Sequence, residues 1–145
     1  MNFKVELSLK TEYSILALIE LASNHASDQP VQIRQIASQQ QIPDRYLEQL
    51  LATLRRHGFV KSQRGARGGY ILSRQPNQIS ILEVVTCVEG VESADQSSTS
   101  AQPSVVKELW QASQKAAASV LSQATIKDLC DRQREQRLAE TMYYI

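Results

Sequence analysis

Apolar residues in the first part of the chain recur at helical spacing and predict three helices. The first spans about Leu9 to Asn24, with Ser8 placed to cap its N-terminus and a polar segment after it. The second is a short amphipathic helix within residues 31–40. The third has Pro43 in its first turn and ends before Gly58, a residue common just past a helix C-terminus. Its single apolar stripe consists of Tyr46, Leu47, Leu50, Leu51 and Leu54.

A different pattern follows the third helix. The runs Phe59–Gln63 and Tyr70–Arg74 are short and rich in β-branched and aromatic residues, and the segment "RGARGG" separates them. This arrangement predicts a β-hairpin, with glycines that permit positive φ angles at its tip. The three glycines are Gly65, Gly68 and Gly69.

The second half of the chain predicts a fourth helix, a loop and a long fifth helix. The fourth helix starts at Ile79 or Ser80 and ends at Gly90. Residues 91–103 are poor in apolar side chains and predict a mobile or disordered loop. A long amphipathic helix of about twenty residues comes next, and Thr125 caps a shorter helix in "TIKDLC". The apolar positions of the long helix are Val105, Val106, Leu109, Trp110, Ala112, Ala116, Ala117, Val120 and Leu121.

These elements predict a mainly α fold with a small β-hairpin. Only about four residues, "QQQI", separate the second and third helices, which favours a helix-turn-helix over an ordinary helical hairpin once the β-hairpin follows as a wing. The predicted organisation is a winged helix-turn-helix domain over 1–90, a flexible loop over 91–103, and a dimerisation helix with a C-terminal segment over 104–145. The long helix has little of the chain left to pack against, so we expect it to pair with a second copy. Packing back on the first helix is the alternative.

The length suits one compact domain, or one small domain with an appended oligomerisation element, and is too short for two large domains. The chain has 145 residues, of which 42% are hydrophobic and 21% charged. No apolar run approaches the roughly 20 residues that cross a bilayer, and the N-terminus has no signal-peptide core, so we expect a cytoplasmic protein without membrane contact. The two cysteines, Cys87 and Cys130, lie far apart and indicate neither a disulfide framework nor a zinc site.

The charges divide unevenly along the chain. Although the net charge is +1, residues 31–75 carry +6 and the remainder therefore carries −5. This asymmetry indicates a polyanion-binding face on an otherwise acidic body. The segment holds two acids, Asp44 and Glu48, and the cations Arg34, Arg45, Arg55, Arg56, Lys61, Arg64, Arg67 and Arg74.

Two other kinds of chemistry fit the residues poorly. A glycine-rich loop with arginines could cradle a nucleotide phosphate, but its glycine spacing matches neither phosphate-binding motif, and the loop leads into a strand rather than a helix N-terminus. An enzyme is not indicated, because no acid–base pair or nucleophile–histidine set is present. The two histidines, His25 and His57, fall at predicted helix ends.

With these elements in place, the chain resembles the Rrf2 family of bacterial transcription regulators. The segment "LSLKTEYSILALIELA" is similar to that family's first helix, "IPDRYLEQLLATLRRHGFVKSQRGARGGYIL" to its recognition helix and wing, and "ISILEVV" to the start of its next helix. The resemblance implies a homodimer that pairs through the long helix near Trp110 and presents two winged helices to a dyad-symmetric site on double-stranded DNA.

The resemblance also implies roles for particular residues. The family's base-reading positions fall on Glu48, which can accept from cytosine N4, and on Gln49, which can bond adenine N6 and N7. Arg64 matches the arginine that enters the minor groove, and the other cations are candidates for phosphate contacts. The predicted DNA-binding set is Lys10, Arg45, Tyr46, Glu48, Gln49, Arg55, Arg56, Arg64, Gly65, Arg67 and Gly68.

The chain departs from the family at its cofactor. Many members bind an iron–sulfur cluster through three cysteines in the loop before the dimerisation helix and a fourth ligand soon after. Here the expected ligand positions hold other residues, and serine oxygen and protonated lysine are poor substitutes for thiolate, so we expect no cofactor. The four positions are Glu92, Ser98, Ser104 and Lys107.

The controlling signal is left open by the sequence. An unidentified small molecule or partner protein could bind the serine-rich loop and the groove beside it, Cys87 or Cys130 could respond to oxidants if its thiol pKa were lowered, or the DNA could be bound constitutively. A winged-helix protein-interaction module that never touches DNA is the alternative function.

Overall fold

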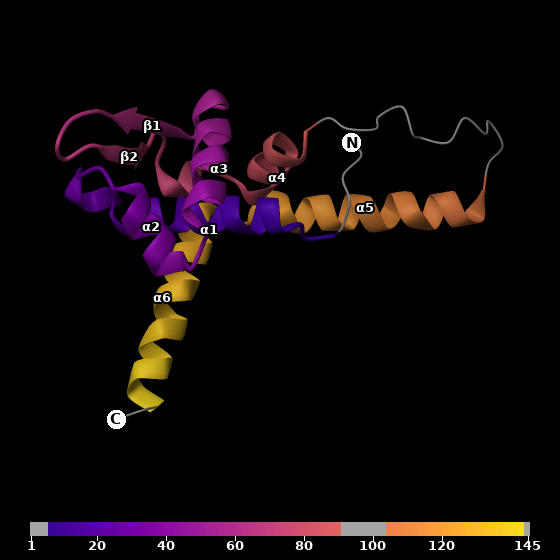
Figure 1. Ribbon diagram of the computed structural model, residues 1–145. Coiled ribbons are helices and arrows are strands. Elements are labelled where there is room, and N and C mark those ends of the chain that lie inside the picture. The colour runs from indigo at the N-terminus through magenta and orange to yellow at the C-terminus, as the bar shows by residue number, and fades with distance from the viewer. Residues whose placement is uncertain (1–5, 91–103, 144–145) are drawn as a thin grey trace.

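The computed structural model describes residues 6–90 and 104–143, and this part of the chain is mainly helical with one antiparallel β-hairpin (Figure 1). In the hairpin, Val60 lies opposite Leu72 and Gln63 opposite Gly69. The elements are α1 (Leu9–Ser23), the 3-10 helix η1 (His25–Ser27), α2 (Ile33–Gln40), α3 (Asp44–Arg56), β1 (Val60–Gln63), β2 (Gly69–Leu72), the 3-10 helix η2 (Pro76–Gln78), α4 (Ile81–Glu89), α5 (Val105–Gln123) and α6 (Ile126–Tyr143).

The helix α1 lies at the centre of the core and contacts α2, α3, α4 and α6. The two predicted caps are confirmed: Ser8 accepts from the Thr11 amide, and the Thr125 hydroxyl accepts from the Asp128 amide at 3.2 Å. Ser80, which was expected only near the start of the fourth helix, forms a capping box with Glu83 at the start of α4. Gly90 ends α4 with φ 78°. The largest fully buried side chains, apart from Ser14, are apolar and come from five helices and the hairpin region: Phe59, Leu18, Leu21, Ile36, Leu47, Leu51, Leu54, Ile79, Ile126, Val60 and Val84.

The first turn of α6 belongs to this core. Ile126 is fully buried, and its backbone N–H donates to the Ile79 carbonyl at 2.9 Å. The Ile81 N–H donates in turn to the Ala124 carbonyl at 2.9 Å. These bonds fix the junction of α5 and α6 against the start of α4.

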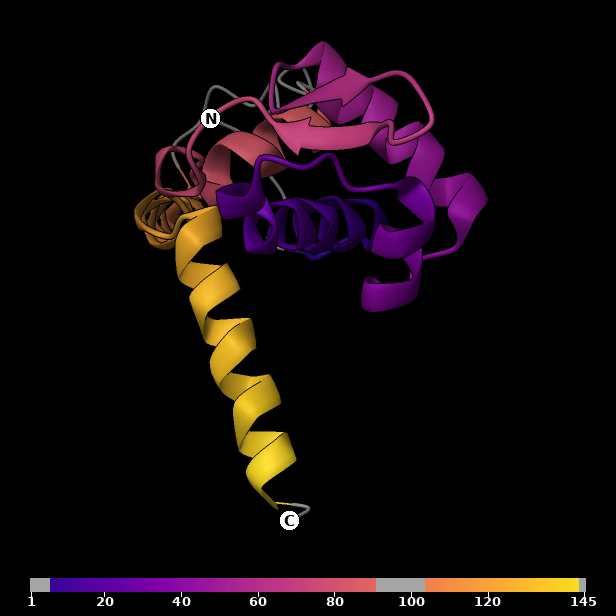
Figure 2. The same ribbon diagram turned by 90° about the vertical axis from the view of Figure 1, so that its left-hand side faces the viewer.

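Both C-terminal helices extend away from the body (Figures 1 and 2). No residue of α5 is buried, and α5 contacts α4 along one side. The helix α6 leaves in another direction, away from the hairpin, and continues to Tyr143. The prediction of only a short helix in "TIKDLC" was therefore wrong in length, because residues 131–143 contain neither glycine nor proline to stop it.

Over the described ranges, no helix is long and apolar enough to cross a membrane. The predicted loop at 91–103, with Glu92 and Ser98, lies outside the described residues.

Candidate nucleic-acid interface

A tight turn joins α2 to α3. Gln41 closes α2 in the left-handed region, with φ 56°, and the Ile42 N–H donates to the Ala37 carbonyl at 3.0 Å. Pro43 stands at the N-cap of α3 rather than in its first turn, and Asp44 follows as an acid at the positive end of the helix dipole. Residues 33–56 therefore form a helix-turn-helix.

The helix α3 divides into a buried and an exposed face. Its four leucines are buried in the core, whereas Arg45, Glu48 and Gln49 are exposed. Tyr46 is 37% exposed, and its ring meets Tyr13 of α1 edge-on at a centroid distance of 5.6 Å. Tyr46 thus also packs α3 against α1, a role that its place in the predicted DNA-binding set did not include.

The wing is bonded directly to the helix-turn-helix. Val31, just before α2, donates to the Tyr70 carbonyl and accepts from the Tyr70 N–H, each at 2.8 Å. A Cβ on Gly69 would lie 2.4 Å from the Val31 carbonyl oxygen, so only glycine allows this approach. The wing and the segment before α2 consequently form one backbone-bonded unit.

The three glycines of the wing are required for different structural reasons. Gly65 has φ 115° at the turn, as predicted. Gly68 has no positive φ; a Cβ there would lie 2.5 Å from the Gln63 carbonyl oxygen. Gly68 and Gly69 are therefore required by close backbone approaches, and the expectation of positive φ was right for Gly65 alone among the three.

The cations of the basic segment divide into restrained and unrestrained groups. Arg74 is restrained, because it pairs with Glu83 at 3.1 Å and lies over the Phe59 ring at 4.9 Å. The guanidinium of Arg55 donates to the Ser62 hydroxyl at 3.3 Å, which ties the end of α3 to β1.

The remaining predicted cations are exposed. Arg56 bonds the Thr53 hydroxyl of its own helix at 3.2 Å. Arg45, Arg64 and Arg67 are exposed and have no ion pair or hydrogen bond from their side chains to any described residue. Lys10 is exposed in the first turn of α1, on a different element from the helix-turn-helix and the wing.

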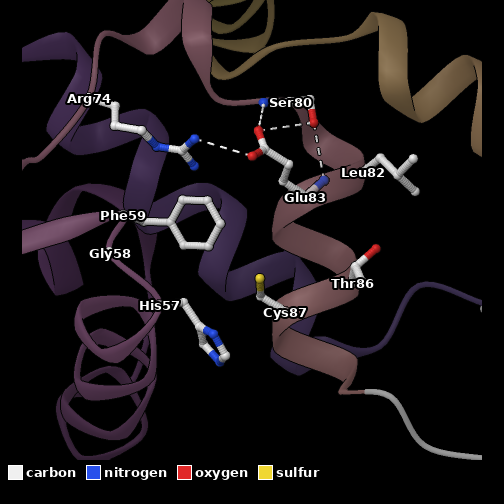
Figure 3. Close-up of a pocket in the computed structure, with 9 residues that line it drawn as sticks. All are labelled: His57, Gly58, Phe59, Arg74, Ser80, Leu82, Glu83, Thr86 and Cys87. Atoms are coloured by element: carbon white, nitrogen blue, oxygen red, sulfur yellow. Dashed lines mark hydrogen bonds and ion pairs between the residues drawn. The ribbon is translucent and has the colours of Figure 1, made fainter.

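An open groove of about 560 Å³ lies between the end of α3 and α4 (Figure 3). Cys87 of α4 faces it, together with His57 and the Arg74–Glu83 pair. Burial raises the pKa of the Cys87 thiol, and the Glu83 charge raises it further. Cys130 is buried against Ser23, with 3.4 Å between sulfur and hydroxyl oxygen. The raised pKa disfavours the Cys87 thiolate, the form that oxidants attack.

Comparison with known proteins gives a consistent result. Residues 7–132 match the profile of the Rrf2 family, described as an iron-dependent transcriptional regulator. The HTH-type transcriptional regulator CymR of Bacillus subtilis is 34% identical over 141 residues, which cover 97% of this chain and all of that protein. Its solved structure has a TM-score of 0.77 at 32% identity, covering 89% of this chain and 98% of that one. The structure of T. potens IscR has a TM-score of 0.79 at 36% identity, covering 91% and 90%.

Proposed function

Because the chain belongs to the Rrf2 family and is a DNA-binding transcriptional regulator, we propose that it acts as a homodimer with α3 in the major groove and the tip of the wing in the adjacent minor groove. The exposed face of α3 is the observation that carries this proposal. Its leucines are turned into the core, which leaves Arg45, Glu48 and Gln49 available to DNA. The names of the relatives support a non-catalytic role, and we place the protein in the cytoplasm with the bacterial chromosome.

The charged and amide residues of the predicted DNA-binding set each have a proposed partner on the duplex. Glu48 accepts from cytosine N4 and Gln49 bonds adenine, so both specify bases. Arg64 enters the minor groove, where its guanidinium, which bonds no described residue, can follow the groove floor. The phosphate contacts come from Arg45, Arg55, Arg56, Arg67 and Lys10, and the lack of side chains at Gly65 and Gly68 lets the wing lie close to the backbone.

The apolar face of α5 supports the proposed homodimer. Val105, Val106, Leu109 and Trp110 are each at least 64% exposed, and Val120 is 68% exposed. Apolar side chains so exposed on one helix are stabilised when a second copy covers them. Pairing through α5 would also place two winged helices on one DNA site.

We further propose that no iron–sulfur cluster is bound in the family manner. Among the expected ligand positions in the described residues, the Ser104 hydroxyl accepts from the Lys107 amide at 3.4 Å as the N-cap of α5. A hydroxyl engaged in capping and a lysine ammonium do not match the thiolate chemistry of a cluster. Anaerobic purification should give protein without stoichiometric iron or charge-transfer bands, and stoichiometric iron would refute this proposal.

The DNA-binding proposal is tested by selecting genomic fragments with the wild-type protein and titrating the enriched sequence. Arg64→Ala should weaken binding and reduce the slope of log affinity against log salt by about 1. Arg132→Ala, which removes the same charge from the exposed side of α6, is the matched control and should leave both unchanged. Equally weak, sequence-blind binding by the wild type and Arg64→Ala would favour the protein-interaction module.

A further inference from the structure

A buried polar cluster links α1, α2 and α6. Glu20 of α1 is only 5% exposed, and its carboxylate accepts from Gln40 Nε2 at 3.0 Å and from Asn24 Nδ2 at 3.3 Å. Gln40, the last residue of α2, is 8% exposed. Polar groups at this depth need partners, so the geometry of the cluster is constrained by its hydrogen bonds.

The third member of the cluster comes from α6. The amides of Gln40 and Gln133 bond each other reciprocally, with both nitrogen-to-oxygen distances at 3.3 Å. One turn further along α6, the Arg137 guanidinium donates to the Gln39 carbonyl at 3.4 Å. Carbonyls in the last turn of a helix have no partner within that helix, and a cation there also interacts favourably with the helix dipole.

From these contacts we propose that Gln133 and Arg137 are positioning residues: they hold the C-terminal end of α2 and thereby set the orientation of α3 on DNA. The inference rests on the DNA-binding function above. Gln40 directly precedes Gln41, whose left-handed conformation begins the turn into α3. The helix α6 also follows α5, the proposed dimerisation helix, almost directly. The cluster therefore connects the C-terminal helices to the end of α2 and, through the turn, to α3.

The test compares two substitutions on the same helix in the full-length protein. Gln133→Leu removes the bonds to α2 at nearly constant volume, whereas Gln136→Leu makes the same chemical change at an exposed position. A second pair, Arg137→Ala and Arg132→Ala, removes equal charge, but only Arg137 contacts α2. Denaturant unfolding of each variant first establishes conditions in which all are fully folded.

Two readouts separate positioning from stability. In Gln133→Leu, the Gln41 and Ile42 amides should exchange faster than in the wild type, by about fivefold for each hydrogen bond lost. In Gln136→Leu, their exchange should match that of the wild type. The affinity ratio between a duplex carrying the enriched sequence and a shuffled duplex of equal composition should fall about fivefold or more. Affinity for the shuffled duplex should stay constant, since the DNA-facing cations are unchanged.

The proposal is overturned if Gln133→Leu lowers stability while its exchange at the turn and its affinity ratio match those of Gln136→Leu. An affinity ratio near one for the wild type would instead refute sequence-specific DNA binding, the function on which this inference rests. The exchange measurement would then still decide whether α6 holds the turn.

Discussion

Replacing Gly69 by alanine should detach the wing from the helix-turn-helix and lower the free energy of unfolding by about 3–4 kcal/mol. The added Cβ would lie 2.4 Å from the Val31 carbonyl oxygen and 2.6 Å from the carbonyl carbon, and neither backbone atom can rotate away. The segment must therefore separate from β2. That separation weakens both 2.8 Å bonds between Val31 and Tyr70, at about 1 kcal/mol each. Partial exposure of the Val31 side chain, now only 3% exposed, adds about 1–2 kcal/mol.

Urea unfolding followed by circular dichroism measures this loss, at one fixed protein concentration because the stability of the proposed dimer would depend on concentration. Gly58→Ala is the control. Gly58 has φ 81°, and an added Cβ would meet no atom within 4 Å, so this substitution should cost only about 1 kcal/mol of backbone strain. If the two variants lose equal stability, the close approach at Val31 does not constrain the wing.

Three further predictions concern α5, the Arg74–Glu83 pair and Cys87. Trp110→Glu should raise the dissociation constant of the proposed dimer about a thousandfold, because the substitution is present in both copies and removes two apolar contacts of about 2 kcal/mol each. Ser119→Glu on the same helix is the control and should remain dimeric in sedimentation velocity. Burial raises the pKa of Glu83, but the capping amide and Arg74 together lower it below its ordinary value. The carboxylate therefore stabilises the fold at neutral pH and loses this effect as the pH falls through the lowered pKa. Glu83→Gln should cost less than about 1 kcal/mol at pH 7, and the difference should shrink below about pH 4; a difference that grows there contradicts the pairing. Because the pKa of Cys87 is raised, iodoacetamide should alkylate its thiol more slowly in the folded protein than in urea, as measured by mass spectrometry. Equal alkylation rates would contradict the raised pKa.

Local patterns predicted most of the fold because the helices and strands around the site carry their signals in adjacent residues. Ser8 and Ser80 cap the helices that follow them, and Gly58 and Gly90 end the helices before them. The helix α6 escaped prediction beyond Cys130 because its later turns have no continuous apolar stripe. An exposed helix of that kind carries no periodic signal.

Contacts between distant residues account for what the sequence could not predict. The requirement for Gly69 arises at Val31, thirty-eight positions earlier, and no local pattern records that approach. Glu20 did leave a detectable signal, since it occupies a core-facing position of α1 after Ala17, yet its partners on α2 and α6 are defined only by the fold. The proposed base-reading residues, Glu48 and Gln49, came from the family resemblance rather than from periodicity.

The paired bonds between Val31 and Tyr70 have a consequence for which DNA sequences suit the protein. A wing bonded to the segment that leads into α2 cannot adjust its angle to α3 without losing those bonds. With α3 in the major groove and the wing in the minor groove, as we propose, the duplex must then supply the correct offset between the two grooves. Base steps that bend or narrow easily meet this requirement at lower energy, so positions that no side chain touches should still contribute to selectivity through DNA deformability.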